Sequence, residues 1–352
     1  MSESLTEKPV VKVIKFEDRY LTETIDVLGH IWKTLDFSQR MKLFVWRYLE
    51  NPYLGEHFVF IALVDERVIG IAPYVTLKFH FGNEVKYVLS AADTVIHPDF
   101  QGVGAYGKMA SYAMDYVKEN NERLKVACYL NLSSNHLSTP MCIKLGWTKL
   151  LPRDYLYKFS ITGFIRTALR IRTNPATKEI AQYRFETDSS PRITEMIGIN
   201  DVLKSPIRSV RDNDFYSWHY RNGSFLFVYA YKGNDLSAYI VLQKSSEYQY
   251  MVLEWVSDSL PTLVKAFRYA TCSMAIPITR LYFMNLNPTE REVLLSSGFV
   301  AIPKLLNKLG KVNRYPALIR PVDLNMGSEK LIVKGVNPML PANWSIMRID
   351  VF

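Results

Sequence analysis

The chain has 352 residues, 48% of them hydrophobic, which is enough to bury two cores, so two domains are expected. Its net charge of +9 is spread along the sequence without a recognisable nucleic-acid-binding module, so DNA and RNA are not expected as partners. Its cysteines, Cys128, Cys142 and Cys272, are too few and scattered for a disulfide framework, and no Cys/His cluster has metal-ligand spacing, so no metal is expected.

The first residues show no targeting or membrane-spanning pattern. Residues 1–8 are polar and include acidic side chains, and no uninterrupted apolar run approaches the roughly 18 residues of a membrane-spanning helix. We therefore expect a cytoplasmic protein without a transmembrane segment. No motif predicts a particular oligomeric state.

The first half of the chain predicts an antiparallel meander that leads into a glycine-rich turn and a helix. Strands are expected at 58–62, 68–78 and 85–96. The segment 94–108 then contains glycines at 102, 104 and 107. Such a turn exposes backbone amides, and the positive end of the helix dipole attracts anions, so the segment is typical of a phosphate cradle. A tight strand-to-helix corner has the same composition.

The loop matches one nucleotide-binding string but lacks its context. Gly102, Gly104 and Gly107 fit Gly-x-Gly-x-x-Gly, yet the preceding meander is not the first strand of a dinucleotide-binding fold, and the Walker string is absent. A better match is Val/Ile-x-Pro followed by Gln/Arg-x-x-Gly-x-Gly/Ala. In this chain these are residues 96–98 and then residues 101–106, where Tyr106 replaces a small residue.

This loop resembles the signature of the GNAT acetyltransferase superfamily. A second match follows the strand expected at 126–131 and the helix expected at 137–145, where residues 141–147 resemble the family's Leu-Tyr-x-Lys-x-Gly-Phe. Cys142 stands at the place of the tyrosine that often protonates the departing thiolate in that family. We expect the Tyr106 ring to turn outward, which leaves its amide facing the phosphate.

The resemblance implies a mixed, mostly antiparallel twisted sheet flanked by helices, with acetyl-CoA as acyl donor between two diverging strands. It places the donor against Val95 and Ile96, its pyrophosphate on the loop of Gln101, Gly102, Val103, Gly104, Ala105 and Tyr106, and its pantetheine arm near Asn131 and Ser134. Ser134 and the following Asn135 have an alternative role as caps of the next helix.

The chemistry requires an amine to lose a proton and a thiolate to gain one. Asp93, near the end of the strand that would hold the donor, is the best candidate for the general base, with a hydrogen-bonded structural aspartate as the alternative. His97 precedes a proline, where a solvated turn histidine is the usual outcome. Cys142 is the candidate acid, although a small buried core residue is the more common role of such a cysteine.

A basic segment follows the first domain. Its helical face of Phe164, Ile165, Ala168 and Leu169 is accompanied by five basic residues and no acidic one between positions 156 and 178: Lys158, Arg166, Arg170, Arg172 and Lys178. Contact with an anionic membrane surface, contact with substrate phosphates, and a plain interdomain connector are the three interpretations, and we favour the connector.

The second half of the chain repeats the order of the first. Residues 216–220 echo residues 44–48, with aromatic residues that either wall the acceptor cleft or pack in a core: Trp46, Tyr48, Trp218 and Tyr220. Strands are then expected at 225–227, 235–243, 250–256 and 280–285, and helices at 263–274 and 289–297.

The second copy lacks the glycine loop, because residues 257–262 contain no glycine. We therefore expect a GNAT-like catalytic domain at 1–160, a basic connector at 161–190 and a degenerate GNAT-like domain at 191–352. The implied function is transfer of an acetyl group from acetyl-CoA to the primary amine of a small molecule, with an amino sugar or nucleotide-linked sugar first among acceptors. A Fem-type aminoacyl-tRNA-dependent transferase and a non-catalytic acyl-CoA sensor or scaffold are the alternatives.

Overall fold

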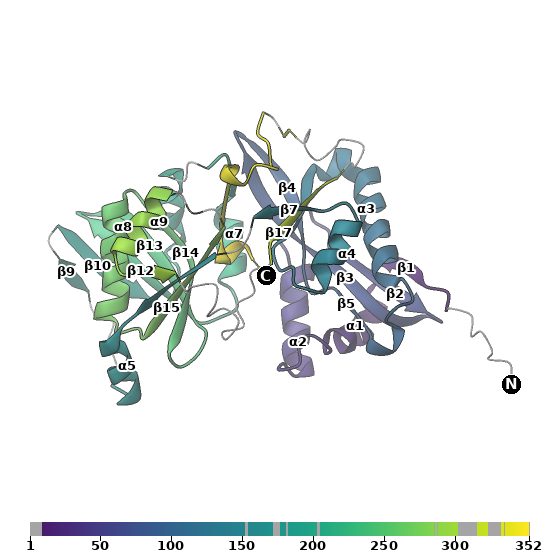
Figure 1. Ribbon diagram of the computed structural model, residues 1–352, viewed down its shortest axis with the longest axis horizontal. Helices are drawn as coiled ribbons and strands as arrows, with labels where there is room; N and C mark the ends of the chain where they lie inside the picture. Colours follow the sequence, from purple (N-terminus) through teal and green to yellow (C-terminus); the bar gives the residue numbers. More distant parts are fainter. Residues whose placement is uncertain are drawn as a thin grey trace.

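The computed structural model describes residues 9–151, 154–171, 177–180, 182–202, 205–284, 286, 288–301, 315–322, 332–333 and 335–351. They form two lobes side by side, each built on a twisted, mostly antiparallel sheet flanked by helices (Figure 1). The expected mixed α/β architecture is confirmed. Among the described residues, no helix is both long enough and apolar enough to cross a membrane.

The first lobe is organised around β2 (Phe58–Val64), whose side chains are all buried. It pairs with β1 (Lys12–Lys15) and β3 (Arg67–Phe81), and β4 (Glu84–Ala91) continues the antiparallel meander. A parallel strand, β6 (Val126–Asn131), follows β4. The other elements of this lobe are α1 (Leu21–Leu28), α2 (Phe37–Phe44), β5 (Val95–Ile96), α3 (Ala105–Leu124), α4 (Ser138–Lys144) and β7 (Thr148–Leu151).

Alternate side chains of β2 enter different cores, because successive residues of a strand point to opposite faces of the sheet. Val59, Ile61 and Leu63 pack in the core that includes residues of α1. Phe58 and Phe60 pack in the core that includes residues of α3. The sheet is therefore covered on both faces, with α3 opposite α1.

The second lobe repeats this order around β12 (Phe225–Lys232), β13 (Asp235–Lys244) and β14 (Gln249–Ser257), which form an antiparallel meander. The predicted helix 263–274 is α8 (Leu260–Arg268) followed by a π-helix, η5 (Tyr269–Ser273). The remaining elements are β9 (Lys178–Ile180), β10 (Tyr183–Asp188), α6 (Ile193–Ile199), α7 (Asn213–His219), β15 (Ile278–Met284), α9 (Pro288–Ser296) and β16 (Val300–Ala301).

Each lobe is completed by a strand from the other half of the chain. β8 (Asp154–Phe159) pairs with β15 and β16 in the second lobe, whereas β17 (Ala317–Pro321) pairs with β6 and β7 in the first. Two further strands, β11 (Ile207–Ser209) and β18 (Trp344–Met347), link β3 to β15. Both β8 and β10 thus pair with strands of the second lobe. β8 precedes the predicted boundary at 160, and β10 lies within the predicted connector.

The repeated tryptophans meet between the lobes. The indole Nε1 of Trp46 donates to the carbonyl of Trp218, and the Nε1 of Trp218 donates to the carbonyl of Trp46, each at 2.9 Å. Corresponding residues of the two copies therefore exchange the same contact, as at an isologous interface between symmetric subunits. This reciprocity supports the internal repeat inferred from the sequence.

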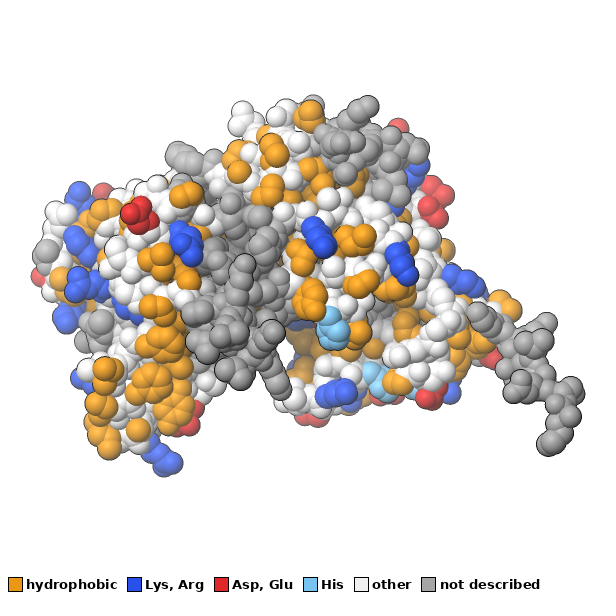
Figure 2. All heavy atoms as spheres, viewed as in Figure 1, with side chains coloured by type: hydrophobic (Ala, Val, Ile, Leu, Met, Phe, Trp, Pro, Cys, Tyr) orange, Lys and Arg blue, Asp and Glu red, His pale blue; other side chains and the backbone are white. Residues whose placement is uncertain are grey.

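The predicted connector begins with α5 (Ile161–Ala168), which lies at the far edge of the second lobe (Figure 1). Apolar side chains gather on the surface at this place (Figure 2). Of the five basic residues predicted to mark the segment, Lys158 is buried and donates to the Ser297 carbonyl at 2.9 Å, whereas Arg172 lies outside the described residues.

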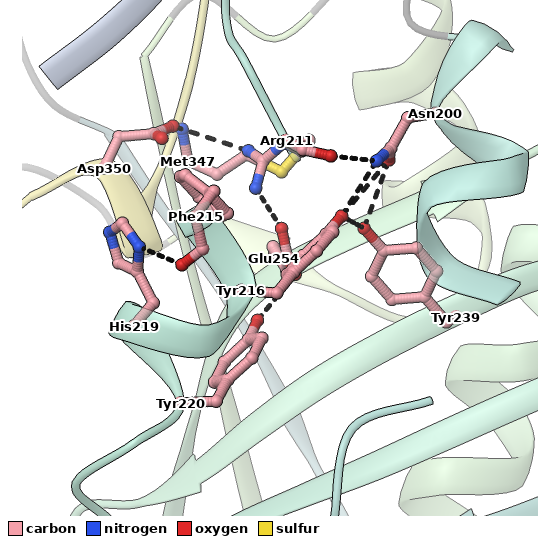
Figure 3. Close-up of polar contacts among 10 residues, drawn as sticks. All are labelled: Asn200, Arg211, Phe215, Tyr216, His219, Tyr220, Tyr239, Glu254, Met347 and Asp350. Atoms are coloured by element: carbon pink, nitrogen blue, oxygen red, sulfur yellow. Dashed lines mark hydrogen bonds and ion pairs between the residues drawn. The ribbon is translucent and has the colours of Figure 1, made fainter. Parts of the chain in front are cut away.

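A buried polar cluster occupies the second lobe near the junction (Figure 3). Arg211 forms ion pairs with Glu254 and Asp350, and all three side chains are at most 3% exposed. Burial opposes the charge on Arg211, but attraction to the two carboxylates outweighs it and raises the pKa of the guanidinium. Burial raises the pKa of Glu254, which also accepts a hydrogen bond from Tyr220 at 2.5 Å. The Tyr216 hydroxyl lies 2.7 Å from that of Tyr239.

Replacing Arg211 with methionine keeps most of the side-chain volume but leaves Glu254 buried without its cation. We expect the free energy of unfolding, measured by urea denaturation, to fall by about 3–5 kcal/mol. The double change Arg211→Met with Glu254→Gln removes both charges of the pair and should recover part of the loss. If Arg211→Met has the same denaturation curve as the wild type, this account of the cluster is contradicted.

Candidate functional site

Two strands of the first lobe diverge at one end. β4 and β6 are paired as far as Ser90 and Leu130. Beyond this point β5 continues the path of β4, but within the described part of the chain it pairs with β3 alone, through Gly70 and Ile71. The end of β6 is therefore separated from β5, as the resemblance to acetyltransferases implied.

The divergence begins at a β-bulge. The pairs Tyr74–Ala91 and Ile71–Val95 are separated by three residues, 92–94, on the segment that joins β4 to β5. On β3 only two residues separate the same pairs. Asp93 is the middle residue and has φ = 47°, in the left-handed region that aspartate tolerates better than most side chains. The prediction of one continuous strand at 85–96 is wrong here, because the extra residue takes the backbone out of the ladder.

The glycine loop leads into α3 without a side-chain cap. Gly102 and Gly104 have φ = 87° and 82°, and a Cβ atom at either position would meet no atom within 4 Å. The amide of Lys108 bonds to the Gly104 carbonyl at 3.2 Å, so the three preceding amides have no acceptor within the helix. An open backbone, and amides that have no acceptor among the described residues, suit an anionic group at the positive end of this 20-residue helix.

A cavity of about 250 Å³ lies where the strands diverge. Its walls come from β3, the bulge, the inner side of α3, the end of β6 and the start of α4. A cavity of about 150 Å³ can hold benzene, so this one has room for a small acyl group. Polar and aromatic residues in its wall include Tyr74, Asp93, Thr94, Tyr106, Asn131 and Trp147.

Asp93 is held in the cavity wall by two donors from the π-helix η2 (Val45–Leu49). Arg47 forms an ion pair with Asp93 Oδ2, and the Tyr48 hydroxyl donates to the same oxygen at 2.7 Å. Burial and the Asp93 charge raise the pKa of Tyr48 well above its usual value, so Tyr48 remains a donor. Burial opposes the Arg47 charge, but Tyr48 and Asp93 outweigh it and raise the pKa of Arg47. The carboxylate is therefore fixed in orientation.

Tyr106 turns inward, and the expectation that its ring faces outward is wrong. Its hydroxyl lies 3.3 Å from Cys142 Sγ, and the Nδ2 atom of Asn131 lies 3.6 Å from the same sulfur. Turning inward removes apolar ring surface from water. Burial raises the pKa of both Tyr106 and Cys142, so both groups keep their protons at neutral pH. A phenol thus lies beside the cysteine that replaces the family's tyrosine.

The other residues predicted to hold the donor differ in their burial and in their hydrogen-bond partners. Val95 is 8% exposed and packs in the core, whereas Ile96 is half-buried. Ser134 is buried, and its hydroxyl donates to the carbonyl of Pro316. Asn135 lines the cavity and accepts hydrogen bonds from the amides of Leu137 and Ser138 at the start of α4, so it has the capping role that was the alternative.

The repeated aromatic residues lie in packed cores. Tyr48, Trp218 and Tyr220 are at most 8% exposed, and Trp46 packs against the core of the first lobe. None of the four is among the residues that line the cavity. Core packing, the alternative to a role in the acceptor cleft, therefore describes them.

The second lobe keeps a counterpart of Asp93 but not the open helix start. Glu254 lies beside a bulge in β14 and accepts a hydrogen bond from Tyr220, as Asp93 does from the equivalent Tyr48. However, the hydroxyl of Ser259 accepts a hydrogen bond from the amide of Thr262 and caps α8. The first turn of α8 thus has a side-chain acceptor, whereas the first turn of α3 has no side-chain cap.

The sequence alone did not predict the inward Tyr106 hydroxyl or the pairing of Arg47 with Asp93. The signal for Tyr106 was its place in the loop, where a small residue is usual. The signal for Arg47 was its position inside the repeat, where the second copy has His219. The acidic residue of the second copy, Glu254, pairs instead with Arg211, which lies outside the repeated segment.

No protein-family model matches the sequence, and no curated protein matches it. Solved structures share its fold. A GCN5-related N-acetyltransferase from Anabaena variabilis has a TM-score of 0.64 at 12% identity, over 91% of this chain and 74% of that one. Eis1 from Mycobacterium abscessus has a TM-score of 0.57 at 12% identity, and the match covers 96% of this chain and 83% of that one. A tandem GNAT protein from the clavulanic acid biosynthesis pathway has a TM-score of 0.54 at 11% identity, and the match covers 89% of this chain and 99% of that one.

These likenesses extend over both lobes, and they confirm at the level of the fold the resemblance that the Gln101 loop suggested. The chain has the fold of these GCN5-related N-acetyltransferases, and its two lobes match a tandem GNAT protein.

Proposed function

We propose that this protein is an acetyl-CoA-dependent N-acyltransferase that transfers an acetyl group, rather than an aminoacyl group, to the primary amine of a small molecule. The observation that carries the proposal is the meeting of diverging strands, an uncapped helix start and a cavity at one end of the first lobe. Each feature is common alone, but together they suit an extended acyl donor. The shared fold supports this class of chemistry.

The residues of the first lobe fit such a donor. The amides of Ala105, Tyr106 and Gly107 would hold its pyrophosphate, and Gly102 and Gly104 leave the approach to the loop open. Asn131, in the cavity wall, would hold the amide-containing arm. The thioester supplies an activated acyl group and a thiol leaving group.

Transfer forms a bond between the acceptor nitrogen and the acyl carbon and breaks the carbon–sulfur bond. Positioning the amine in the cavity supplies much of the rate. Asp93, fixed by Arg47 and Tyr48, accepts a hydrogen bond from the amine and takes its proton directly or through a water molecule. A carboxylate held in one orientation favours a single approach of the nitrogen.

The proton that the sulfur gains is assigned to Tyr106. Its hydroxyl is protonated at neutral pH and lies in the cavity wall, whereas Cys142 is 1% exposed behind it. The 3.3 Å contact with Cys142 and the neighbouring Asn131 fix the direction of the phenol. Tyr106 thus takes the role that the sequence assigned to Cys142, and Cys142 positions it.

An amino sugar or a nucleotide-linked sugar remains the first acceptor class to test. The proposal is tested by titrating the protein with acetyl-CoA and then measuring thiol release with a panel of primary amines. Binding without thiol release across the panel would favour a sensor. A folded protein that does not bind acetyl-CoA would refute the proposal and favour a Fem-type transferase or a scaffold.

Changing Gly104 to alanine should weaken acetyl-CoA binding by roughly tenfold or more, because alanine disfavours φ = 82° and the loop must rearrange. Gly198→Ala is the matched control, since this glycine lies in the helix α6 of the second lobe and a Cβ there meets no atom within 4 Å. Isothermal titration measures both variants after circular dichroism confirms their folding. Equal affinity of the two variants would count against the cradle.

Changing Tyr106 to phenylalanine should lower kcat by about 100-fold while the KM for acetyl-CoA stays within about twofold, because only the proton donor is lost. Tyr112→Phe is the control on the same helix, where the side chain is 40% exposed. Because burial raises the pKa of Tyr106, its contribution should persist as the pH rises from 7 to about 9. Unchanged kcat in Tyr106→Phe would remove this residue from the mechanism.

A further inference from the structure

The helix α5 docks on the second lobe through its smallest residue. The hydroxyl of Ser160 caps the helix by accepting a hydrogen bond from the Gly163 amide at 3.1 Å, and the Ser160 amide donates to the Pro277 carbonyl at 2.9 Å. A Cβ atom at Gly163 would lie 2.7 Å from backbone atoms of Ile276 and Pro277. The face of α5 that touches the protein therefore has no room for a larger side chain.

The large apolar side chains of this segment point to solvent instead. Ile161 is 79% exposed, Ile165 53% and Leu169 65%, although a surface helix normally turns such residues inward. Figure 2 shows the resulting apolar surface at the edge of the second lobe. We call it the α5 patch and define it by Phe159, Ile161, Phe164, Ile165, Leu169, Ile171 and Tyr248, each at least 37% exposed.

Basic side chains border the α5 patch. Arg166 and Arg170 are exposed on the same segment, and both line a shallow groove with Lys244. Glu247 is the one acidic residue among those that line this groove. Residues 159–171 include no acidic side chain. The surface thus combines exposed apolar side chains with an excess of positive charge.

We propose that the α5 patch binds an anionic lipid surface, with its apolar side chains in the interface and its arginines at the headgroup phosphates. An eight-residue helix is about 12 Å long, so it lies on a bilayer rather than crossing the roughly 30 Å hydrocarbon core. Each basic residue near an anionic surface adds to the attraction.

The charge argues against a second copy of the chain as the occupant. In a symmetric dimer the α5 patch would face itself and bring the arginines of both copies together, which repulsion disfavours. Anionic headgroups complement the same arginines. The patch lies in the second lobe, whereas the cavity lies in the first, so the proposal does not depend on acyl transfer.

Co-sedimentation of the full chain with vesicles tests the proposal. We expect the protein to sediment with vesicles of phosphatidylglycerol and phosphatidylcholine, and to bind about tenfold more weakly to phosphatidylcholine alone or to the mixed vesicles in high salt. Wild-type protein that stays in the supernatant with the anionic vesicles would overturn the proposal.

Variants separate the α5 patch from a general effect of charge. The double change Ile161→Glu with Leu169→Glu should lower binding at least tenfold, because it places charge at the apolar contact. The matched control adds the same charge at exposed apolar positions outside the patch, Val10→Glu with Leu340→Glu, and should bind like the wild type. Equal loss of vesicle binding in both variants would overturn the assignment. So would a wild-type protein that does not bind vesicles but forms a dimer, seen by ultracentrifugation, that the patch variant does not form.

Discussion

The reciprocal exchange of β8 and β17 is the constraint on which the rest of the structure depends. Each sheet contains a strand from the other half of the chain, so the backbone hydrogen bonds of one lobe are completed only when both halves fold. β6, which forms one wall of the cavity, is held by β4 on one side and by β17 on the other. The second half of the chain therefore helps to set the separation of the diverging strands, although the helix α8 of the second lobe has a capped start.

The two copies show how one arrangement can yield a cavity or a packed core. In both, a tyrosine from the repeated helix donates to an acidic residue beside a bulge. In the second lobe Glu254 is fully buried with Arg211, and burial raises its pKa. In the first lobe Asp93 stays partly exposed at a cavity, with Arg47 beside it. The site that retains access to solvent is the one suited to chemistry.

The proposed lipid contact and the proposed reaction use different lobes. The strand exchange makes those lobes parts of one unit, because β8 leads directly from the first lobe into α5. A membrane-bound α5 would tether both lobes to the lipid surface. Its docking through Gly163 keeps the helix fixed to the body of the protein while its apolar residues remain available.

Sequence by itself determined the local elements of this protein. Alternating and buried apolar residues predicted the meander of β2 to β4, and glycines whose positive φ disfavours other residues predicted the loop before α3. The repeat of residues 44–48 at 216–220 predicted a second copy. These features are visible because neighbours in sequence are sufficient to produce them.

Tertiary structure decided the contacts between distant residues. The bulge at Asp93, the inward turn of Tyr106 and the pairing of Arg47 with Asp93 depend on packing across strands and helices. The exchange of β8 and β17 also escaped prediction, because a strand's pattern shows which of its faces is buried but not which strand it pairs with. The exposure of α5 was decided in the same way, since Gly163 rather than its apolar face meets the second lobe.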